Sequence, residues 1–160
     1  HEPIPSMREI FEIFDGTRAT LNIELKNSKI PYEGMEERLL ELAGKYSVNV
    51  VYSSFNIQSM GRIRKLDSSA KTGLLYEPWL VKAPDVVAAA HEQGADAIHP
   101  YALNMLDGFI REVHDAGLAL APWTVDLSVL VRHFAAEGVE TVITNDARMA
   151  AEAVLLSKTQ

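Results

Sequence analysis

Glu24 and Lys26 are the two side chains of this sequence with the clearest capacity for chemistry. They are two residues apart in a stretch, residues 21–27, in which apolar and polar residues alternate. Because the side chains of a strand point alternately to its two faces, the carboxylate and the ammonium share one face. A carboxylate oxygen suits Mg²⁺ or Ca²⁺, and a lysine beside it suits a phosphate oxygen. The pair therefore predicts a site for a phosphate-bearing ligand.

The same pair also has a plainer interpretation, as a salt bridge on the solvated face of an edge strand. In the interior of a parallel sheet, by contrast, two charged side chains need a ligand or each other, because burying an unpaired charge is costly. The position of this strand in the sheet therefore decides how the pair is interpreted.

Composition excludes several classes of protein. The sequence is 48% hydrophobic and 23% charged, which is typical of a globular domain. A net charge of −7 without a Lys/Arg-rich block argues against a nucleic-acid binder, and no apolar run approaches the roughly 20 residues of a membrane span. The chain has no cysteine, which excludes thiolate catalysis and Cys-based zinc sites. The absence of cysteine is compatible with the cytoplasmic location that we expect.

The elements that must position these residues repeat along the chain. Ser6 and Glu9 form a capping-box pattern that predicts a first helix. Later, three predicted helices each end at a glycine that a strand follows directly. These glycines and strands are Gly94 with 97–99, Gly117 with 118–125, and Gly138 with 139–144. Helix–glycine–strand units in succession are typical of α/β proteins with parallel strands.

Six strands are expected, near residues 20, 50, 73, 97, 120 and 141. No glycine-rich phosphate-binding turn of the dinucleotide-binding type is present. We therefore predict a TIM-type (β/α) barrel, formed by residues 1–160 as a single partial domain. About six of the eight units of such a barrel would be present and the first two strands missing. The strand at 21–27 would then lie in the interior of the sheet.

Three further residues stand at the ends of predicted strands, where the active site of a TIM barrel lies. Phe55 follows the second strand, His99 ends the fourth and Trp123 ends the fifth. The indole of Trp123 could form an apolar wall for a substrate, although a single aromatic residue is more often part of the core. His99 either contacts the substrate or packs beside Pro100.

Five segments resemble the glycerophosphodiester phosphodiesterase family. They follow the order of that family's motifs across essentially the whole chain, and together they are specific. The segments are residues 4–9, 21–26, 51–56, 123–126 and 138–146.

The resemblance implies a TIM barrel that hydrolyses small-molecule glycerophosphodiesters to glycerol 3-phosphate and an alcohol, with Mg²⁺ or Ca²⁺ as the divalent metal. Glu24 matches the metal-binding glutamate, and Lys26 matches the lysine that contacts the phosphate, which makes it the catalytic candidate of this chain. Trp123 matches the aromatic residue that flanks the glycerol, and Phe55 lies at the matching wall of the site. His99 is added as a third substrate-binding candidate.

The sequence departs from the family in one large respect. The His-Arg catalytic motif, the Glu-x-Asp metal pair and the second catalytic histidine precede the first helix in the family, and none is present here. The resemblance implies that one histidine acts as base and the other as acid. We therefore expect the isolated chain to be inactive and to self-associate through exposed sheet edges.

Two other functions are compatible with the same sequence. The barrel remnant could be a non-catalytic binding or interaction module that has lost the chemistry. Less favoured is an unrelated TIM-barrel isomerase or aldolase that forms a Schiff base on Lys26.

Overall fold

A computed structural model describes residues 3–77, 85–105 and 108–157. Its strands form one parallel sheet in the order β1-β2-β3-β4-β5. The strands are β1 (Thr20–Glu24), β2 (Asn49–Ser54), β3 (Lys71–Tyr76), β4 (Ala97–Pro100) and β5 (Ala119–Leu120). The helices are α1 (Met7–Phe14), α2 (Met35–Ala43), α3 (Ile57–Leu66), α4 (Val86–Glu92), α5 (Phe109–Asp115), α6 (Ser128–Ala136), α7 (Ala147–Ser157) and the 3-10 helix η1 (Ala102–Asn104).

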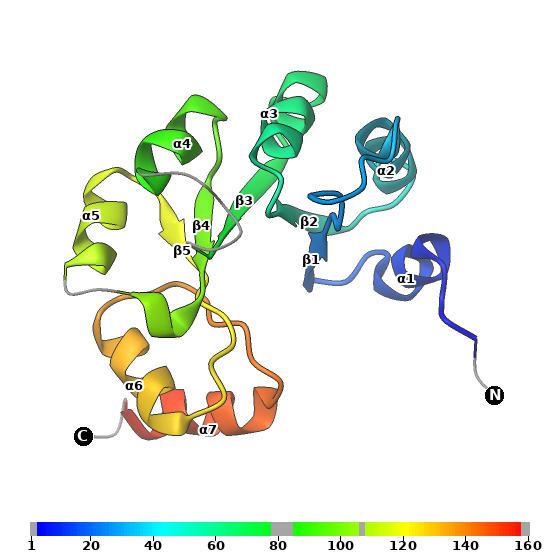
Figure 1. The fold of residues 1–160 in the computed structure, drawn as a ribbon. Coiled ribbons are helices and arrows are strands. Elements are labelled where there is room, and N and C mark those ends of the chain that lie inside the picture. The colour runs from blue at the N-terminus through cyan, green and yellow to red at the C-terminus, as the bar shows by residue number, and fades with distance from the viewer. Residues whose placement is uncertain (1–2, 78–84, 106–107, 158–160) are drawn as a thin grey trace.

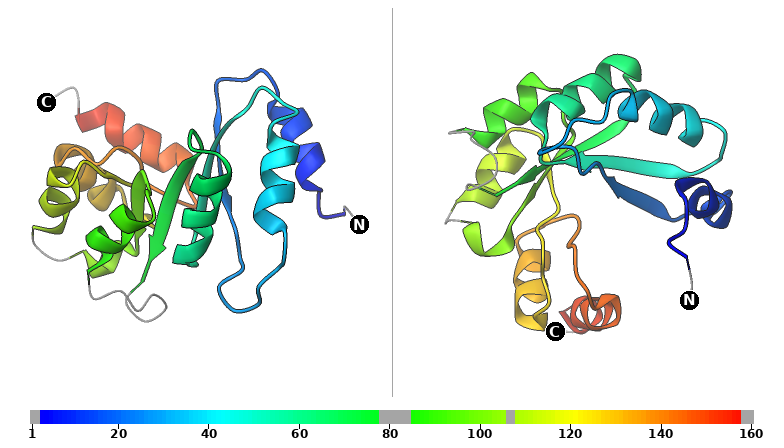
Figure 2. Two further views of the ribbon diagram at one scale, coloured as in Figure 1. Left: turned by 90° about the horizontal axis from the view of Figure 1, so that it is seen from above. Right: turned by 45° about the vertical axis from the view of Figure 1, so that its right-hand side comes forward.

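The sheet curves, and helices cover its outer side. Figure 1 shows α2, α3, α4 and α5 around the strands, with α1 beside β1 at one end and the α6–α7 pair beyond β5 at the other. The two further views in Figure 2 show the same outer layer of helices. A parallel sheet whose strands alternate with outer helices is a partial (β/α) barrel, which confirms the predicted fold class.

The core lies mainly between the outer face of the sheet and the helices. Leu74 of β3, Ile98 of β4 and Leu120 of β5 form one apolar cluster with side chains of α4 and α5 that include Ala90 and Val113. Each is fully or almost fully buried, and burying one such leucine or isoleucine stabilises the fold by about 1.5–3 kcal/mol. The strands therefore place apolar side chains on the face that the helices cover.

Local signals in the sequence account for several element ends. The Ser6 hydroxyl accepts a hydrogen bond from the Glu9 amide at 3.3 Å, and the Glu9 carboxylate accepts one from the Ser6 amide at 2.7 Å, which confirms the capping box. Gly94, Gly117 and Gly138 have φ values of +65°, +74° and +81°, the left-handed conformation that ends a helix. The sequence Ala83-Pro84-Asp85 also predicts a helix start; residues 83 and 84 lie outside the described residues, and the Asp85 side chain caps α4 by accepting a hydrogen bond from the Ala88 amide.

The sixth predicted strand, residues 139–144, is not a strand. Ile143 donates a backbone hydrogen bond to Pro122, and Val125 donates one to Ile143, but no ladder forms. Near the start of this segment, the side-chain carboxylate of Glu140 accepts the Leu120 amide at 3.0 Å. That amide is therefore engaged by a side chain rather than by a neighbouring backbone.

The fifth strand is also shorter than the 118–125 that we predicted. It is confined to Ala119–Leu120, although the Ala121 and Trp123 amides still donate hydrogen bonds to the Ile98 and Pro100 carbonyls of β4. Beyond it, only an isolated bridge pairs Trp123 with Tyr101.

Within the described residues the strand at 21–27 lies at the edge of the sheet, and its interior position in a barrel with two further strands before it stays a prediction. Among the described residues β1 pairs with β2 alone, with Glu24 opposite Ser53, so it is an edge strand. Its other edge has no hydrogen-bonded neighbour among those residues. In the part of the chain that is described, no helix combines the length and apolar character needed to cross a bilayer.

Candidate active site

Glu24 and Lys26 lie at the C-terminal end of β1. The Lys26 ammonium is 3.6 Å from a Glu24 carboxylate oxygen, and the two side chains are 81% and 34% exposed, respectively. Such an exposed ion pair contributes at most about 1 kcal/mol to stability. The contact therefore aligns the two groups without removing either from solvent, where an anionic ligand can reach them.

The aromatic candidates meet at the ends of β2 and β5. Phe55 and Trp123 form an edge-on contact with ring centroids 5.6 Å apart, and Tyr101 packs against the same indole at 5.1 Å. The indole N–H donates a hydrogen bond to the His99 carbonyl at 2.8 Å. A Trp ring with a satisfied N–H and two aromatic neighbours has a fixed position. The three rings form one side of the candidate site.

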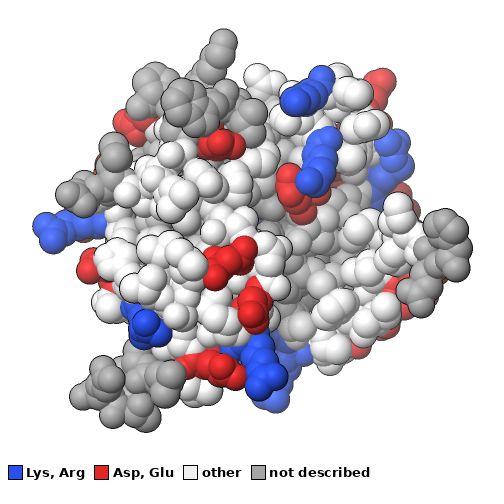
Figure 3. All heavy atoms as spheres, turned by 60° about the horizontal axis from the view of Figure 1, so that its bottom comes forward, with Lys and Arg blue, Asp and Glu red and all other residues white. Residues whose placement is uncertain are grey.

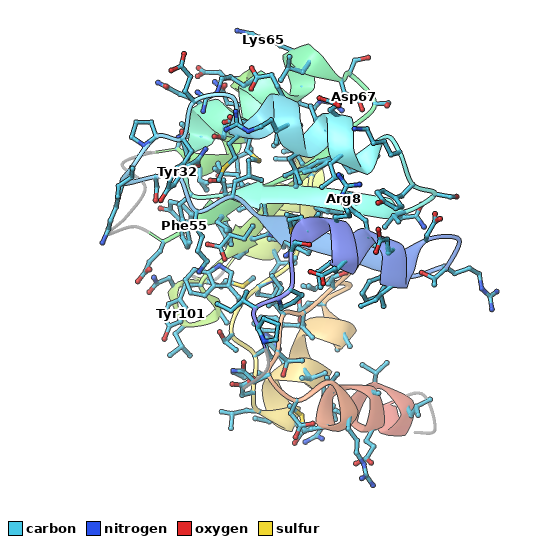
Figure 4. The ribbon with its side chains drawn as sticks, turned by 90° about the vertical axis from the view of Figure 1, so that its right-hand side faces the viewer. Arg8, Tyr32, Phe55, Lys65, Asp67 and Tyr101 are labelled. Carbon is cyan, nitrogen blue, oxygen red and sulfur yellow. The ribbon has the colours of Figure 1, made fainter. Side chains whose placement is uncertain are left out.

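Sequence reasoning missed Tyr101. The available signal was its place directly after β4, at the end of the sheet where the other candidates lie. Figure 4 shows Tyr101 and Phe55 at the same end of the molecule as Tyr32, whereas Asp67 lies at the opposite end. The loops that follow β1, β2 and β4 therefore bring aromatic side chains to one end of the sheet.

His99 is 3% exposed and packs over Gly73 of the neighbouring strand. A Cβ atom at Gly73 would lie 2.3 Å from the His99 Nε2, so the glycine is what leaves room for the ring. The His99 Nδ1 has no hydrogen-bond partner among the described residues. Burial lowers the pKa of His99 to about 4. The imidazole is therefore neutral at pH 7 and has an unused polar atom.

The ring also borders a cavity of about 270 Å³ on the inner side of the sheet. Asn22 of β1 and Val51 of β2 line it from one side, and Glu140 from the other. His99 is thus placed among inward-facing residues of several strands, and its predicted substrate contact stays a prediction.

The described residues do not complete a divalent metal site. No group of three or more His, Asp or Glu side chains comes together among them. Mg²⁺ requires six oxygen ligands, and Ca²⁺ six to eight. Glu24 fits one ligand position as an accessible carboxylate, and its role as a metal ligand stays a prediction.

Comparison with known proteins supplies the family. Residues 1–149 match the model of the glycerophosphoryl diester phosphodiesterase family. The chain belongs to this family. It is 33% identical over 147 residues to a glycerophosphodiester phosphodiesterase of Caldanaerobacter subterraneus subsp. tengcongensis, and the match covers 91% of this chain. The same match covers 59% of that relative, so the chain spans less than two thirds of its length.

Solved structures show the fold of the family. A Silicibacter pomeroyi protein assigned as a glycerophosphoryl diester phosphodiesterase superposes with a TM-score of 0.84 at 21% identity, over 96% of this chain and 57% of its own. An Oleispira antarctica phosphodiesterase, whose structure is in complex with the product sn-glycerol-3-phosphate, has a TM-score of 0.76 at 16% identity, over 98% of this chain and 62% of its own. The resemblance seen in the sequence and the partial barrel are both confirmed.

Within this member of the family, the predicted residues form two groups. Glu24 contacts Lys26, and Trp123 contacts both Phe55 and the backbone of His99. In the described residues, no hydrogen bond, ion pair or ring contact joins the charged group to the aromatic one. The two groups therefore occupy separate parts of the same end of the sheet.

Proposed function

We propose that the complete polypeptide containing this sequence is a glycerophosphodiester phosphodiesterase, which hydrolyses a glycerophosphodiester to glycerol 3-phosphate and an alcohol. The observation that carries this proposal is the family match over residues 1–149, with a carboxylate and a lysine paired at the C-terminal end of β1. The structure of the Oleispira antarctica protein of the same fold is in complex with the glycerol phosphate product of such a reaction.

In this proposal the charged pair, Glu24 and Lys26, binds the phosphate group of the substrate. Lys26 is free to reach a phosphate oxygen because its side chain is 81% exposed, and its ammonium offsets negative charge that develops there. Glu24 holds Lys26 in place and provides one oxygen ligand for Mg²⁺ or Ca²⁺. A bound cation supplies Lewis-acid stabilisation of the phosphate. Because one carboxylate does not complete such a site, the proposal for the ion rests on the family resemblance.

The aromatic group orients the rest of the substrate. Phe55 and Trp123 present apolar ring surface that suits the carbon skeleton of a glycerol or alcohol group. His99 is proposed as a further substrate contact through the inner cavity that its ring borders, although its neutral ring is buried and its Nδ1 has no hydrogen-bond partner among the described residues. Proton transfer is assigned to the two histidines that the resemblance places outside this chain, so we propose that residues 1–160 alone do not turn over substrate.

The test is hydrolysis of glycerophosphocholine by the complete polypeptide and by residues 1–160, each with and without EDTA. We expect turnover only with the complete polypeptide and its loss in EDTA. Replacing Lys26 by alanine should lower kcat/KM, whereas the exposed Lys45→Ala should not. Turnover by residues 1–160 would contradict the proposal that proton transfer depends on histidines outside this chain. Binding without turnover by the complete polypeptide would favour a non-catalytic module.

We also propose that residues 1–160 form a single partial-barrel domain of a cytoplasmic protein that acts on small molecules rather than nucleic acid. In support, Figure 3 shows acidic and basic side chains mixed on one face, without a basic stripe. The unpaired edge of β1 supports self-association of the isolated chain. Sedimentation of residues 1–160 tests the last point, with a monomer at all concentrations as the contrary result.

A further inference from the structure

A buried polar network lies directly behind the charged pair. Asn27, Glu36 and Ser59 are each at most 3% exposed. The Asn27 amide donates hydrogen bonds to the Ser59 hydroxyl at 2.7 Å and to Glu36 Oε1 at 3.2 Å. The Ser59 hydroxyl donates to the same Glu36 oxygen at 2.6 Å. Three elements, the β1–α2 loop, α2 and α3, therefore meet at one carboxylate oxygen.

An arginine of α3 completes the network. Arg62 Nε donates to Glu36 Oε1 at 3.0 Å, and its Nη2 contacts the same oxygen and the Ser59 hydroxyl, the latter at 2.9 Å. Burial by itself would raise the pKa of Glu36, but hydrogen bonds from Ser59 and Arg62 outweigh it and hold the pKa below its usual value. Glu36 is therefore a charged group inside the protein, and it needs all of these donors.

The network reaches the backbone on both sides of Lys26. The Ser54 hydroxyl lies 2.7 Å from the Leu25 carbonyl and 3.2 Å from Asn27 Oδ1. The Asn56 side chain donates to the Asn27 carbonyl at 3.3 Å. Lys26 is thus an exposed residue between two buried, hydrogen-bonded neighbours, and its backbone cannot shift unless these bonds break.

We call five of these side chains the clamp. They are Asn27, Glu36, Ser54, Ser59 and Arg62.

Stability alone does not account for the clamp. A buried charged network is often no more stabilising than well-packed apolar residues of similar volume, and replacing it can even stabilise a protein. Hydrogen bonds of fixed direction do, however, hold a loop in one conformation better than apolar packing. The clamp converges on the residue next to Lys26, in the loop that carries the phosphate contact of the proposed site.

We infer that Asn27, supported by the rest of the clamp, is a positioning residue that sets the place of Lys26 relative to Glu24. This inference rests on the proposed function. It assigns Asn27 no contact with the substrate, so its effect must act through Lys26.

The experiment is a double-mutant cycle in the complete polypeptide with glycerophosphocholine as substrate. We expect Asn27→Ala to lower kcat/KM at least about tenfold, since a displacement of about 1 Å is enough for such losses. In the Lys26→Ala background, Asn27→Ala should change kcat/KM by less than about twofold, because the group it positions is absent. Its effect on Tm should be the same in both backgrounds.

A matched control separates positioning from general destabilisation. Val113 of α5 is fully buried in the apolar cluster of Leu74, Ile98 and Leu120, on the same outer face of the sheet as the clamp but beside β5 rather than beside β1 and β2. Val113→Ala should lower Tm while leaving kcat/KM within about twofold, when assayed well below both Tm values. The inference would be overturned if Val113→Ala and Asn27→Ala lowered kcat/KM equally. It would also be overturned if Asn27→Ala lowered kcat/KM as much in the Lys26→Ala background as in the wild type. An inactive wild-type polypeptide would instead contradict the proposed function.

A second readout requires no turnover. After reductive ¹³C-methylation of the polypeptide, the methyl resonance of Lys26, assigned by its absence in Lys26→Ala, should differ between the wild type and Glu24→Gln at one fixed pH. We expect Asn27→Ala to abolish that difference and Val113→Ala to preserve it. A Lys26 resonance that still responds to Glu24→Gln in the Asn27→Ala background would overturn the inference even if the polypeptide is inactive.

Discussion

The β1 end and the β4–β5 end of the candidate site are built in different ways. At β1 the functional side chains are charged and exposed, with Lys26 at 81% and Glu24 at 34%, and buried polar side chains hold the loop from behind. At β4 and β5 the side chains are aromatic, and Trp123 is held by ring contacts and by backbone bonds that continue past the strand ends.

The difference reflects how each kind of side chain is held in place. An exposed ion pair gains little from its own contact, so a loop that presents charges needs hydrogen bonds elsewhere. An aromatic ring brings its own packing energy and needs only one partner for its polar atom. We therefore expect changes at the β1 end to affect the chemical step, and changes at the β4–β5 end to affect stability and substrate affinity.

The largest expected effect is at the β1 end. Glu24→Gln keeps the size of the side chain and removes its charge, so it should lower kcat/KM of the complete polypeptide about a thousandfold. Most of the loss should be in kcat, as measured with glycerophosphocholine at saturating Mg²⁺. Glu41→Gln, on the exposed face of α2, is the control and should change kcat by less than about twofold. A loss below tenfold for Glu24→Gln would show that the chemical step does not depend on the β1 end.

Near the β4–β5 end, we expect the largest loss of stability from a substitution at Gly73, which lies close to the His99 ring. Gly73→Ala places a Cβ atom 2.3 Å from the imidazole, and such overpacking should lower the free energy of unfolding by about 3 kcal/mol. Gly44→Ala is the control, because Gly44 has ordinary helical φ and an added Cβ atom would meet nothing nearer than the Leu40 carbonyl oxygen at 3.4 Å. Urea unfolding measures both. If His99→Ala does not restore part of the stability lost in Gly73→Ala, the imidazole is not the obstacle.

The buried imidazole should also make stability depend on pH. The pKa of His99 is about 4 in the folded protein against 6.5 ordinarily. Above pH 6.5 the ring is neutral in both states; as the pH falls below 6.5 the unfolded state takes up the proton first, so stability is lost. From pH 7 to pH 5 the loss should be about 2 kcal/mol. His99→Phe, which cannot titrate, should lack this part of the slope in urea unfolding, and an unchanged slope would show that the ring is accessible to protons.

The smallest effect should come from the indole. Trp123→Phe keeps an aromatic ring but loses the hydrogen bond to the His99 carbonyl and part of the wall, so KM should rise about threefold to tenfold with kcat nearly unchanged. Steady-state kinetics of the complete polypeptide measure both constants. A fall in kcat larger than the rise in KM would mean that the aromatic end takes part in the chemical step, and the contrast between the two ends would fail.

Much of the fold could be predicted because its signals are local. The capping box at Ser6 and the glycines at 94, 117 and 138 act through neighbouring backbone groups, so they are visible in the sequence. The segment at 139–144 has the same local pattern but no ladder, because the Glu140 side chain accepts the Leu120 amide. Local pattern cannot show which partner a backbone group will find.

The candidate site likewise has a part that the sequence predicts and a part that it does not. Glu24 ends β1 and Lys26 lies two residues further on, so their closeness in the sequence made a contact between them predictable. The sequence by itself also determined the family, through motifs in a fixed order. The clamp could not be foreseen, because Asn27 and Ser59 are 32 residues apart.

Only the tertiary structure decided that Tyr101 joins Phe55 and Trp123, and that His99 is buried and neutral. These properties depend on which neighbours the folded chain brings together. Residue spacing carries no information on such long-range contacts.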